Sequence, residues 1–411
     1  MKKIGLVPKL IIAIVLGILV GAFLPAGIVK ILITFSDLFG TFLKFIVPLM
    51  IIAFVTVGIA DLTQGAGKLL GVTTVLSYTS NVIAGTIAFF VAITLFPKFM
   101  DASLLATIGN PEETALAPYF KIDIPPLLDV TSAIVFAFIM GLGMSTLRSK
   151  KIIGETSYNV FSEFSKIIVK VLECVVIPFL PFYILGTFAN MTYTGETFAI
   201  ISVLWKVFLV VIILHLLYIT ALFFIAGGIG KKNPLKLIKN QIPGYLTAVG
   251  TQSSAACIPV NLECAYNNGT SKEISEFVIP LCATIHMAGS IITITCCVTS
   301  VLLIFNMPVG FQVMMPLVFA LGIAMIASPG APGGSIMAAL PFLPIVGISP
   351  EGAIASLLIA LYITQDSFGT AANISGDNAL AVIIDAIYKK FIKDSKNKSS
   401  DIESKAEEAN V

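Results

Sequence analysis

Long apolar stretches separated by short polar connections run along almost the whole chain. Each stretch has about 20 residues or more, which is the length that an α-helix needs to cross the hydrocarbon core of a bilayer. The pattern predicts an all-α multi-pass membrane protein. Its eight expected membrane-spanning helices lie near 8–27, 39–60, 69–97, 131–147, 163–191, 197–228, 277–305 and 350–389.

Two further apolar stretches are interrupted at their centres. Residues 235–275 contain YLTAVGTQSSAACIPVNLECAY, and residues 308–347 contain LGIAMIASPGAPGGSIMAALPFLP. The apolar arms on either side of each Ser-, Gly- and Pro-rich centre have only about 10–15 residues, too few to cross alone. Because unpaired backbone groups are costly in lipid, each centre must be buried in protein or line a watery cavity. The pattern predicts two re-entrant helical hairpins, and the alternative is two short spans kinked at Gly and Pro.

Each interrupted stretch is followed by a long helix with polar residues in its middle, at 277–305 and 350–389. If the first hairpin enters from the cytoplasm and the second from outside, the two units form an inverted repeat. In transporters, such a repeat points to a binding site at the interface between its halves.

The second of these helices carries an unusual polar stripe in the segment QDSFGTAANISGD, residues 365–377. Asp366, Thr370, Asn373 and Asp377 are spaced so that they share one helix face. A carboxylate at the bilayer centre costs at least about 2.5 kcal/mol, so both aspartates need partners. The only arginine, Arg148, lies in an expected cytoplasmic loop. We therefore expect a cation, a proton or an ammonium group as the partner, although hydrogen bonding between helices is an alternative role.

Several ligands suit this stripe. Asn373 and Asp377 are one turn apart, and together with carbonyls from a broken helix they offer the oxygens that Na⁺ prefers. Asp366 can pair with an amino group, and helix N-termini at the hairpin tips suit a carboxylate. The pattern predicts a zwitterion site beside a cation site. A second carboxylate on the substrate would favour an arginine partner, which the membrane segments lack, so we expect a neutral substrate.

Composition supports a membrane protein, since the chain is 57% hydrophobic and only 12% charged. Its mean hydropathy is +0.99. Soluble domains carry about twice that share of charge. The formal net charge of +2 implies no nucleic-acid partner. The six cysteines include no C-x-x-C pair, so neither a metal centre nor a disulfide framework is expected.

Basic residues mark one side of the expected membrane protein. They gather at the N-terminus and at 148–151, 231–239 and 389–398, whereas the loop at 98–129 is acidic. The positive-inside rule places both termini in the cytoplasm. The first apolar stretch is too long for a signal-peptide core, so we interpret it as a retained helix. We expect residues 390–411 to form a disordered cytoplasmic tail.

Two other protein classes fit the stripe poorly. An intramembrane aspartyl protease needs two carboxylates that share a proton, but Asp366 and Asp377 are about 16 Å apart along one helix. No nucleophile with a base is evident beside Ser335 either, so no enzyme activity is expected. A channel would need no amino-pairing aspartate at a closed site in the middle of the membrane.

With these residues in view, the chain resembles the dicarboxylate/amino acid:cation symporter family, which has the glutamate-transporter fold. The resemblance is specific over roughly 235–389 and weaker before it. Within the family the chain is most similar to bacterial serine/threonine:sodium symporters. The segments that carry the resemblance are SSAACIPVN (253–261), ATIHMAGS (283–290) and QDSFGTAANISGD (365–377).

The resemblance implies a homotrimer in the bacterial cell membrane that works as an elevator, in which a transport core slides against a static scaffold. The scaffold would comprise about 1–62 and 131–195, and the core about 69–97 and 197–389. The implied function is import of a small neutral amino acid, serine or threonine, coupled to Na⁺. No cofactor is expected beyond this coupling ion.

The resemblance also implies roles for individual residues. Ser254 and Asn373 would hold the substrate α-carboxylate, Asp366 and Thr370 would take the amino group, and the second hairpin tip would be the gate. The full implied substrate set is Ser253, Ser254, Ser290, Ala331, Gly333, Ser335, Asp366, Thr370 and Asn373. One Na⁺ would bind Asp377 and the carbonyls of Cys282, His286 and Asn373. A second Na⁺ would bind carbonyls of Thr284, Met325, Ile326 and Ser328.

The chain departs from the family pattern at several positions. Gly369 and Gln252 are uncharged where carriers of acidic substrates have an arginine, which agrees with a neutral substrate. Ala288 removes the carboxylate of a third sodium site. His286 replaces an asparagine of the serine carriers and leaves the ion count open. We expect it to be either a structural histidine bonded to a backbone carbonyl or a proton relay. His215 is expected to be structural.

These departures leave three alternatives open. A proton-coupled neutral amino acid transporter and a carrier of acidic amino acids or dicarboxylates from the same family both remain possible. The choice among small neutral amino acids is open as well, because one methylene in a pocket changes binding by only about 1–3 kcal/mol.

Overall fold

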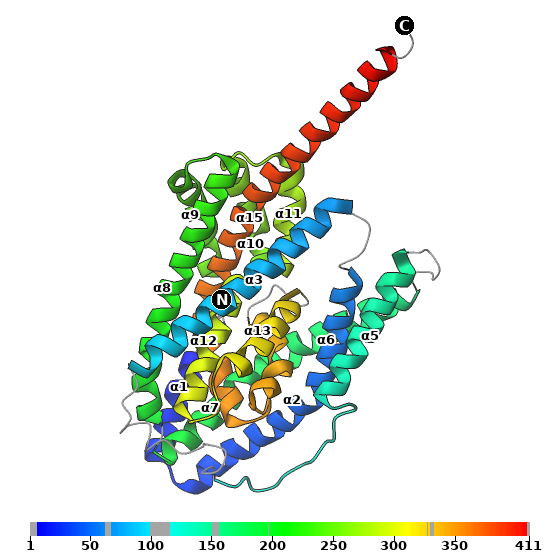
Figure 1. Cartoon of the computed structure of the whole chain (residues 1–411). Coiled ribbons are helices and arrows are strands. Elements are labelled where there is room, and N and C mark those ends of the chain that lie inside the picture. The colour runs from blue at the N-terminus through cyan, green and yellow to red at the C-terminus, as the bar shows by residue number, and fades with distance from the viewer. Residues whose placement is uncertain are drawn as a thin grey trace.

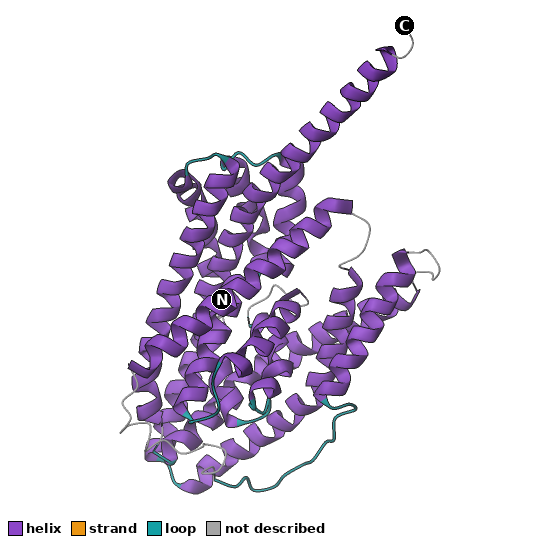
Figure 2. Cartoon of the chain, viewed as in Figure 1, coloured by secondary structure: helices purple, strands orange, loops and turns teal. Residues whose placement is uncertain are grey.

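The computed structural model describes residues 6–61, 67–98, 116–149, 156–195, 197–326, 328 and 333–408. All regular secondary structure in these residues is helical, as Figure 2 shows. Five described helical segments are long and apolar enough to cross a membrane, namely Ala26–Val57, Leu69–Lys98, Thr156–Tyr193, Leu204–Gly230 and Lys272–Ile304. The predicted all-α class is confirmed, and the count of eight spans stays a prediction.

The N-terminal half supplies one group of helices. Its members are α1 (Leu6–Phe23), α2 (Ala26–Asp61), α5 (Val130–Ser149), α6 (Thr156–Val171) and α7 (Ile177–Tyr193). A π-helical turn at Leu172–Val176 joins α6 to α7. The long helix α2 packs against α5, α6 and α7, and α1 packs along α7. These contacts join segments on both sides of the 62–129 region into one unit.

A second group surrounds the polar stripe. Its long helices are α3 (Gly67–Leu95, followed by a 3-10 turn at Phe96–Lys98), α8 (Thr197–Gly230), α12 (Ala288–Ile304) and α15 (Ala353–Glu408). Helix α15 packs against α12, α8 and α9, and α12 also packs against α3. Every α12 residue except Leu303 is buried. A helix that is apolar all round belongs in the centre of a bundle, which is where α12 lies.

Both interrupted stretches fold as short helices with a break between them. The first comprises α9 (Pro234–Thr251) and α10 (Ser254–Asn267), which pack against each other. The chain turns between them at Gln252, whose φ is +56°. The second comprises α13 (Phe311–Ile326), α14 (Gly334–Ala339) and a 3-10 helix, η3 (Leu340–Val346). Gly333 starts α14 with φ +73°, a conformation that glycine adopts without strain.

The prediction of one continuous helix at 277–305 is wrong, because α11 (Lys272–Ile285) ends before His286 and α12 begins at Ala288. Helix α15 continues through Glu408 and extends away from the bundle (Figure 1), and the expected disorder of residues 390–411 stays a prediction. Residues 390–408 contain no Gly or Pro. Extending an existing helix also avoids the cost of nucleation.

Candidate functional site

The polar stripe of α15 is buried as a whole. Asp366 and Thr370 are each 4% exposed, Asn373 is 2% exposed and Asp377 is fully buried. Buried carboxylates need hydrogen-bond or charge partners. Besides residues of α15 itself, the partners are Gly333 at the start of α14, His286 at the end of α11 and Ser290 of α12, so the stripe is the place where these elements meet.

Asp366 is held through both of its carboxylate oxygens. Its Oδ2 accepts the backbone N–H of Gly333 at 2.7 Å, which brings the second hairpin onto α15. The hydroxyl of Tyr362, one turn earlier, lies 2.9 Å from Oδ1. The Thr370 hydroxyl lies at 3.5 Å from the same oxygen, at the limit of a hydrogen bond. The structure thus brings Asp366, Thr370 and Gly333 together, and their binding of a substrate stays a prediction.

Asn373 is held by the first turn of α12. Its Nδ2 donates to Ser290 Oγ at 2.9 Å, and the Ser290 N–H donates to Asn373 Oδ1 at 3.1 Å. The two helices approach closely at Gly289, where an added Cβ would lie 2.3 Å from the Gly369 carbonyl oxygen. A residue larger than glycine at 289 would therefore separate Ser290 from Asn373.

The two hairpin tips reach α15 at consecutive residues. Gln252 Nε2, at the first tip, donates to Ser367 Oγ at 2.8 Å, beside the Gly333–Asp366 bond of the second tip. Ser254 is buried in the first turn of α10, and Ser253 caps that helix by accepting the N–H of Ala256 at 3.3 Å. The N-terminus of α10 therefore lies at the tip, where its dipole favours a negative group.

Two other residues of the predicted substrate set, Ser335 and Ala331, are not part of these contacts. Ser335 lies in α14 with its Oγ 3.3 Å from Met287 Sδ. Ala331 lies outside the described residues. The shared binding of one carboxylate by Ser254 and Asn373 stays a prediction.

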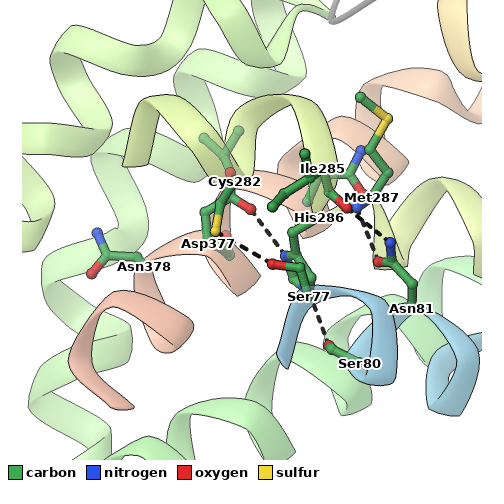
Figure 3. A network of polar contacts seen from close by, with 12 residues as sticks. Ser77, Ser80, Asn81, Cys282, Ile285, His286, Met287, Asp377 and Asn378 are labelled. Carbon is green, nitrogen blue, oxygen red and sulfur yellow. Dashed lines mark hydrogen bonds and ion pairs between the residues drawn. The ribbon is translucent and has the colours of Figure 1, made fainter. Parts of the chain in front are cut away.

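Asp377 contacts the break between α11 and α12, as Figure 3 shows. His286 Nδ1 lies 2.9 Å from Asp377 Oδ1, and His286 Nε2 lies 2.9 Å from Ser80 Oγ of α3. The expected backbone-carbonyl partner of the His286 side chain is therefore wrong: its ring spans a carboxylate and a hydroxyl. This link holds one oxygen of Asp377 in place.

The other oxygen, Asp377 Oδ2, is buried and has no hydrogen-bond partner among the described residues. Leaving a buried acceptor unsatisfied costs about 1–3 kcal/mol, and more for a charged one. Cys282 lies beside this carboxylate (Figure 3), and Asn373 is one helical turn away along α15. A buried carboxylate oxygen without a partner suits a hard monovalent cation.

The second predicted cation set lies where two helices end. Thr284 is in the last turn of α11, and Met325 and Ile326 end α13, which packs against α11. The carbonyls of a last helical turn lack intrahelical partners and carry the negative end of the helix dipole. The Ser328 N–H uses one of these carbonyls, that of Met325, at 3.2 Å. The set is thus gathered in one region, and its binding of Na⁺ stays a prediction.

Sequence reasoning missed a group of polar residues on α3. Asn81 accepts the N–H of Met287 and donates to the carbonyl of Ile285, both at 3.0 Å, so it joins the two sides of the break (Figure 3). Ser80 contacts His286 and also the Tyr218 hydroxyl at 2.8 Å. The signal was the spacing of Ser77, Ser80 and Asn81 on one face of an apolar helix. Tyr362, one turn before Asp366, was missed as well.

His215 is buried beside the same region. Its Nε2 lies 2.9 Å from the carbonyl oxygen of Gly289 and 3.1 Å from Thr293 Oγ1. These contacts support the backbone just before Ser290 and agree with a structural histidine.

The sequence pattern of the sodium:dicarboxylate symporter family matches residues 6–387. The chain belongs to this family. It is similar to the serine/threonine transporter SstT of Acinetobacter baumannii (strain AYE), with 27% identity over 397 residues, covering 93% of this chain and 97% of that protein. It is also 26% identical over 407 residues to the serine/threonine transporter SstT of Acinetobacter baylyi, covering 94% of this chain and 98% of that protein.

Membership of the symporter family identifies the chain as a sodium-coupled membrane transporter. The resemblance drawn from the hairpin and stripe segments is confirmed over nearly the whole chain. The family and these relatives are transporters, which is consistent with a protein that is not an enzyme.

Proposed function

We propose that this symporter imports a small neutral amino acid, serine or threonine, together with Na⁺ across the bacterial cell membrane. The observation that carries the proposal is the arrangement of the α15 stripe. Asp366 has partners at both oxygens but no basic side chain among them, whereas Asp377 has an unpartnered buried oxygen. A zwitterion and a monovalent cation complement these two carboxylates.

The amino group of the substrate would bind Asp366. A carboxylate accepts about four hydrogen bonds, and the three donors at Asp366 leave room for one ammonium N–H. The α-carboxylate would lie near Asn373 and the N-terminus of α10. Both relatives are named serine/threonine transporters, which supports the choice of substrate.

The absence of a guanidinium near the stripe argues against an acidic substrate. The chain has one arginine, Arg148, and its guanidinium lies 3.7 Å from the ring centre of Tyr158, in the first helix group. A side-chain carboxylate on the substrate would find no such partner beside Asp366, and burying it unpaired would be costly.

The proposed transport cycle is an elevator with the scaffold and core given above. The packing supports this division, because α2 binds α5, α6 and α7 while α15 binds α8, α9 and α12. We propose eight spans, two re-entrant hairpins and a homotrimer. The basic segment 231–239 lies at the end of the bundle from which the C-terminal helix extends, and the loop at 116–128 lies at the opposite end (Figure 1), which supports a cytoplasmic C-terminus. The basic residues near the N-terminus support a cytoplasmic N-terminus.

The test is uptake of radiolabelled L-serine into proteoliposomes, driven by an inward Na⁺ gradient or an inward proton gradient, with glutamate as competitor. We expect Na⁺-driven uptake that glutamate does not inhibit, and Asp366→Asn liposomes serve as the matched control. Uptake driven only by the proton gradient would mean that H⁺, and not Na⁺, is the coupling ion. Strong inhibition by glutamate would contradict the neutral substrate.

A further inference from the structure

Tyr362 is a fully buried side chain at the meeting point of three elements. Its hydroxyl lies 2.9 Å from Asp366 Oδ1 in α15 and 3.0 Å from Ser290 Oγ in α12. One phenolic oxygen therefore links α15 to α12, and through Asp366 it is joined to Gly333 at the start of α14.

The contacts form a chain from Asn373 to Asp366 with Ser290 and Tyr362 as its middle members. Asn373 Nδ2 donates to Ser290 Oγ at 2.9 Å. The Tyr362 hydroxyl faces Ser290 Oγ at 3.0 Å and Asp366 Oδ1 at 2.9 Å, so its single proton lies between two acceptors. Because an ionised carboxylate is the stronger acceptor, Tyr362 stabilises Asp366 while its oxygen stays in contact with Ser290.

We infer that Tyr362 is a positioning residue for substrate binding, an inference that rests on the proposed function. Through Ser290, its hydroxyl links the carboxylate that takes the amino group to the amide that takes the α-carboxylate. The two ends of the site are thereby held at a fixed separation. A site held in its binding geometry loses less free energy on ordering when the substrate binds.

The contacts of Tyr362 lie on the amino acid side of the stripe and not on the cation side. Its hydroxyl contacts Asp366 and Ser290, whereas Asp377 is held by His286 and Ser80. Removing the hydroxyl should therefore weaken the binding of the amino acid and leave the response to Na⁺ unchanged.

The experiment compares Tyr362→Phe with Tyr183→Phe in proteoliposomes. Tyr183 is a matched control, because it is 2% exposed and its hydroxyl bonds the carbonyls of Glu351 and Gly352 at 3.2 and 3.1 Å. Each variant loses one buried hydroxyl and keeps its ring. We expect Tyr362→Phe to raise the KM for serine about ten-fold or more, the loss typical of a hydrogen bond to a charged group.

In the same variant the maximal rate at saturating serine and the half-saturating Na⁺ concentration should stay at the wild-type values. Tyr183→Phe should keep the wild-type KM. A merely structural role would lower the yield of folded protein or the maximal rate of both variants and leave both KM values unchanged, which would overturn the inference.

A double-mutant cycle with Ser290→Ala adds a second measurement. Because Tyr362 and Ser290 act in one hydrogen-bonded chain, the effects of the two substitutions on KM should be clearly less than additive. Additive effects would contradict the chain. If wild-type protein takes up no serine, the proposed function fails and the inference fails with it. A wild-type KM in Tyr362→Phe overturns the inference alone.

Discussion

Asp366 and Asp377 lie on one buried face of the same helix, but the protein surrounds their carboxylates differently. Asp366 is enclosed by a backbone N–H from the second hairpin and by two hydroxyls of its own helix. Asp377 is bound at one oxygen by an imidazole, and its other oxygen has no partner among the described residues.

The difference indicates two kinds of ligand. Donors from a hairpin tip and from α15 hold Asp366, so the proposed gate is in direct contact with the proposed amino-binding carboxylate. The ring that holds Asp377 comes from the break between α11 and α12 and is supported by α3. The first environment suits a substrate that enters past the tip, and the second suits a small ion in a site formed by the bundle itself.

The largest expected effect is that of Asp366→Asn. Removing one charge of a buried ion pair costs about 3 kcal/mol or more, equivalent to a loss of serine affinity of roughly 100-fold. Na⁺ binding should remain, because Asp377 and its partners are unchanged. Serine binding and Na⁺-dependent thermal stabilisation of purified protein would measure both. Unchanged serine affinity would exclude the amino-binding role.

Asp377→Asn should weaken Na⁺ binding and leave the serine site intact. Its effect should be somewhat smaller than that of Asp366→Asn. The amide keeps an oxygen for His286 but lacks the charge that a cation needs, so the half-saturating Na⁺ concentration should rise at least about ten-fold. Serine uptake measured against Na⁺ concentration provides the test. A half-saturating Na⁺ concentration equal to that of the wild type would rule out Asp377 as an ion ligand.

A third substitution, Asn81→Ala, tests whether α3 supports the Asp377 side. It removes two buried hydrogen bonds and leaves the Ile285 carbonyl and the Met287 N–H without that partner, at about 1–3 kcal/mol for each group. We expect a lower Tm in detergent and weaker stabilisation by Na⁺. The KM for serine at saturating Na⁺ should change little. A raised KM with normal Na⁺ stabilisation would place Asn81 on the Asp366 side instead.

The smallest effect is expected for Thr370→Ala. Its hydroxyl lies 3.5 Å from Asp366 Oδ1, where a hydrogen bond is weak. Its loss should change the KM for serine by less than about five-fold, corresponding to less than about 1 kcal/mol. Transport assays of Thr370→Ala and Asp366→Asn under the same conditions would show the difference between their KM values for serine. An effect as large as that of Asp366→Asn would mean that Thr370 contacts the substrate directly.

Local patterns in the chain were sufficient to predict much of the site. The four-residue stripe follows from helical periodicity, and the two hairpins follow from Gly, Pro and Ser between short apolar arms. The interruption at His286–Met287 was not foreseen, because neither of these residues is Gly or Pro and the apolar stretch continues on both sides. Tertiary hydrogen bonds from Asn81 replace the helical ones lost there.

The amino-acid sequence by itself determined that this chain is helical, that it belongs in a membrane, and that one helix carries two carboxylates needing external partners. These properties depend on composition and spacing, which are local. Only the tertiary structure decided which carboxylate oxygens of Asp366 and Asp377 already have a hydrogen-bond partner. The residues that hold Asp366 and Asp377, directly or through His286, come from positions as far apart in the chain as Ser80, His286 and Gly333. Packing brings these residues together, and no local pattern encodes that packing.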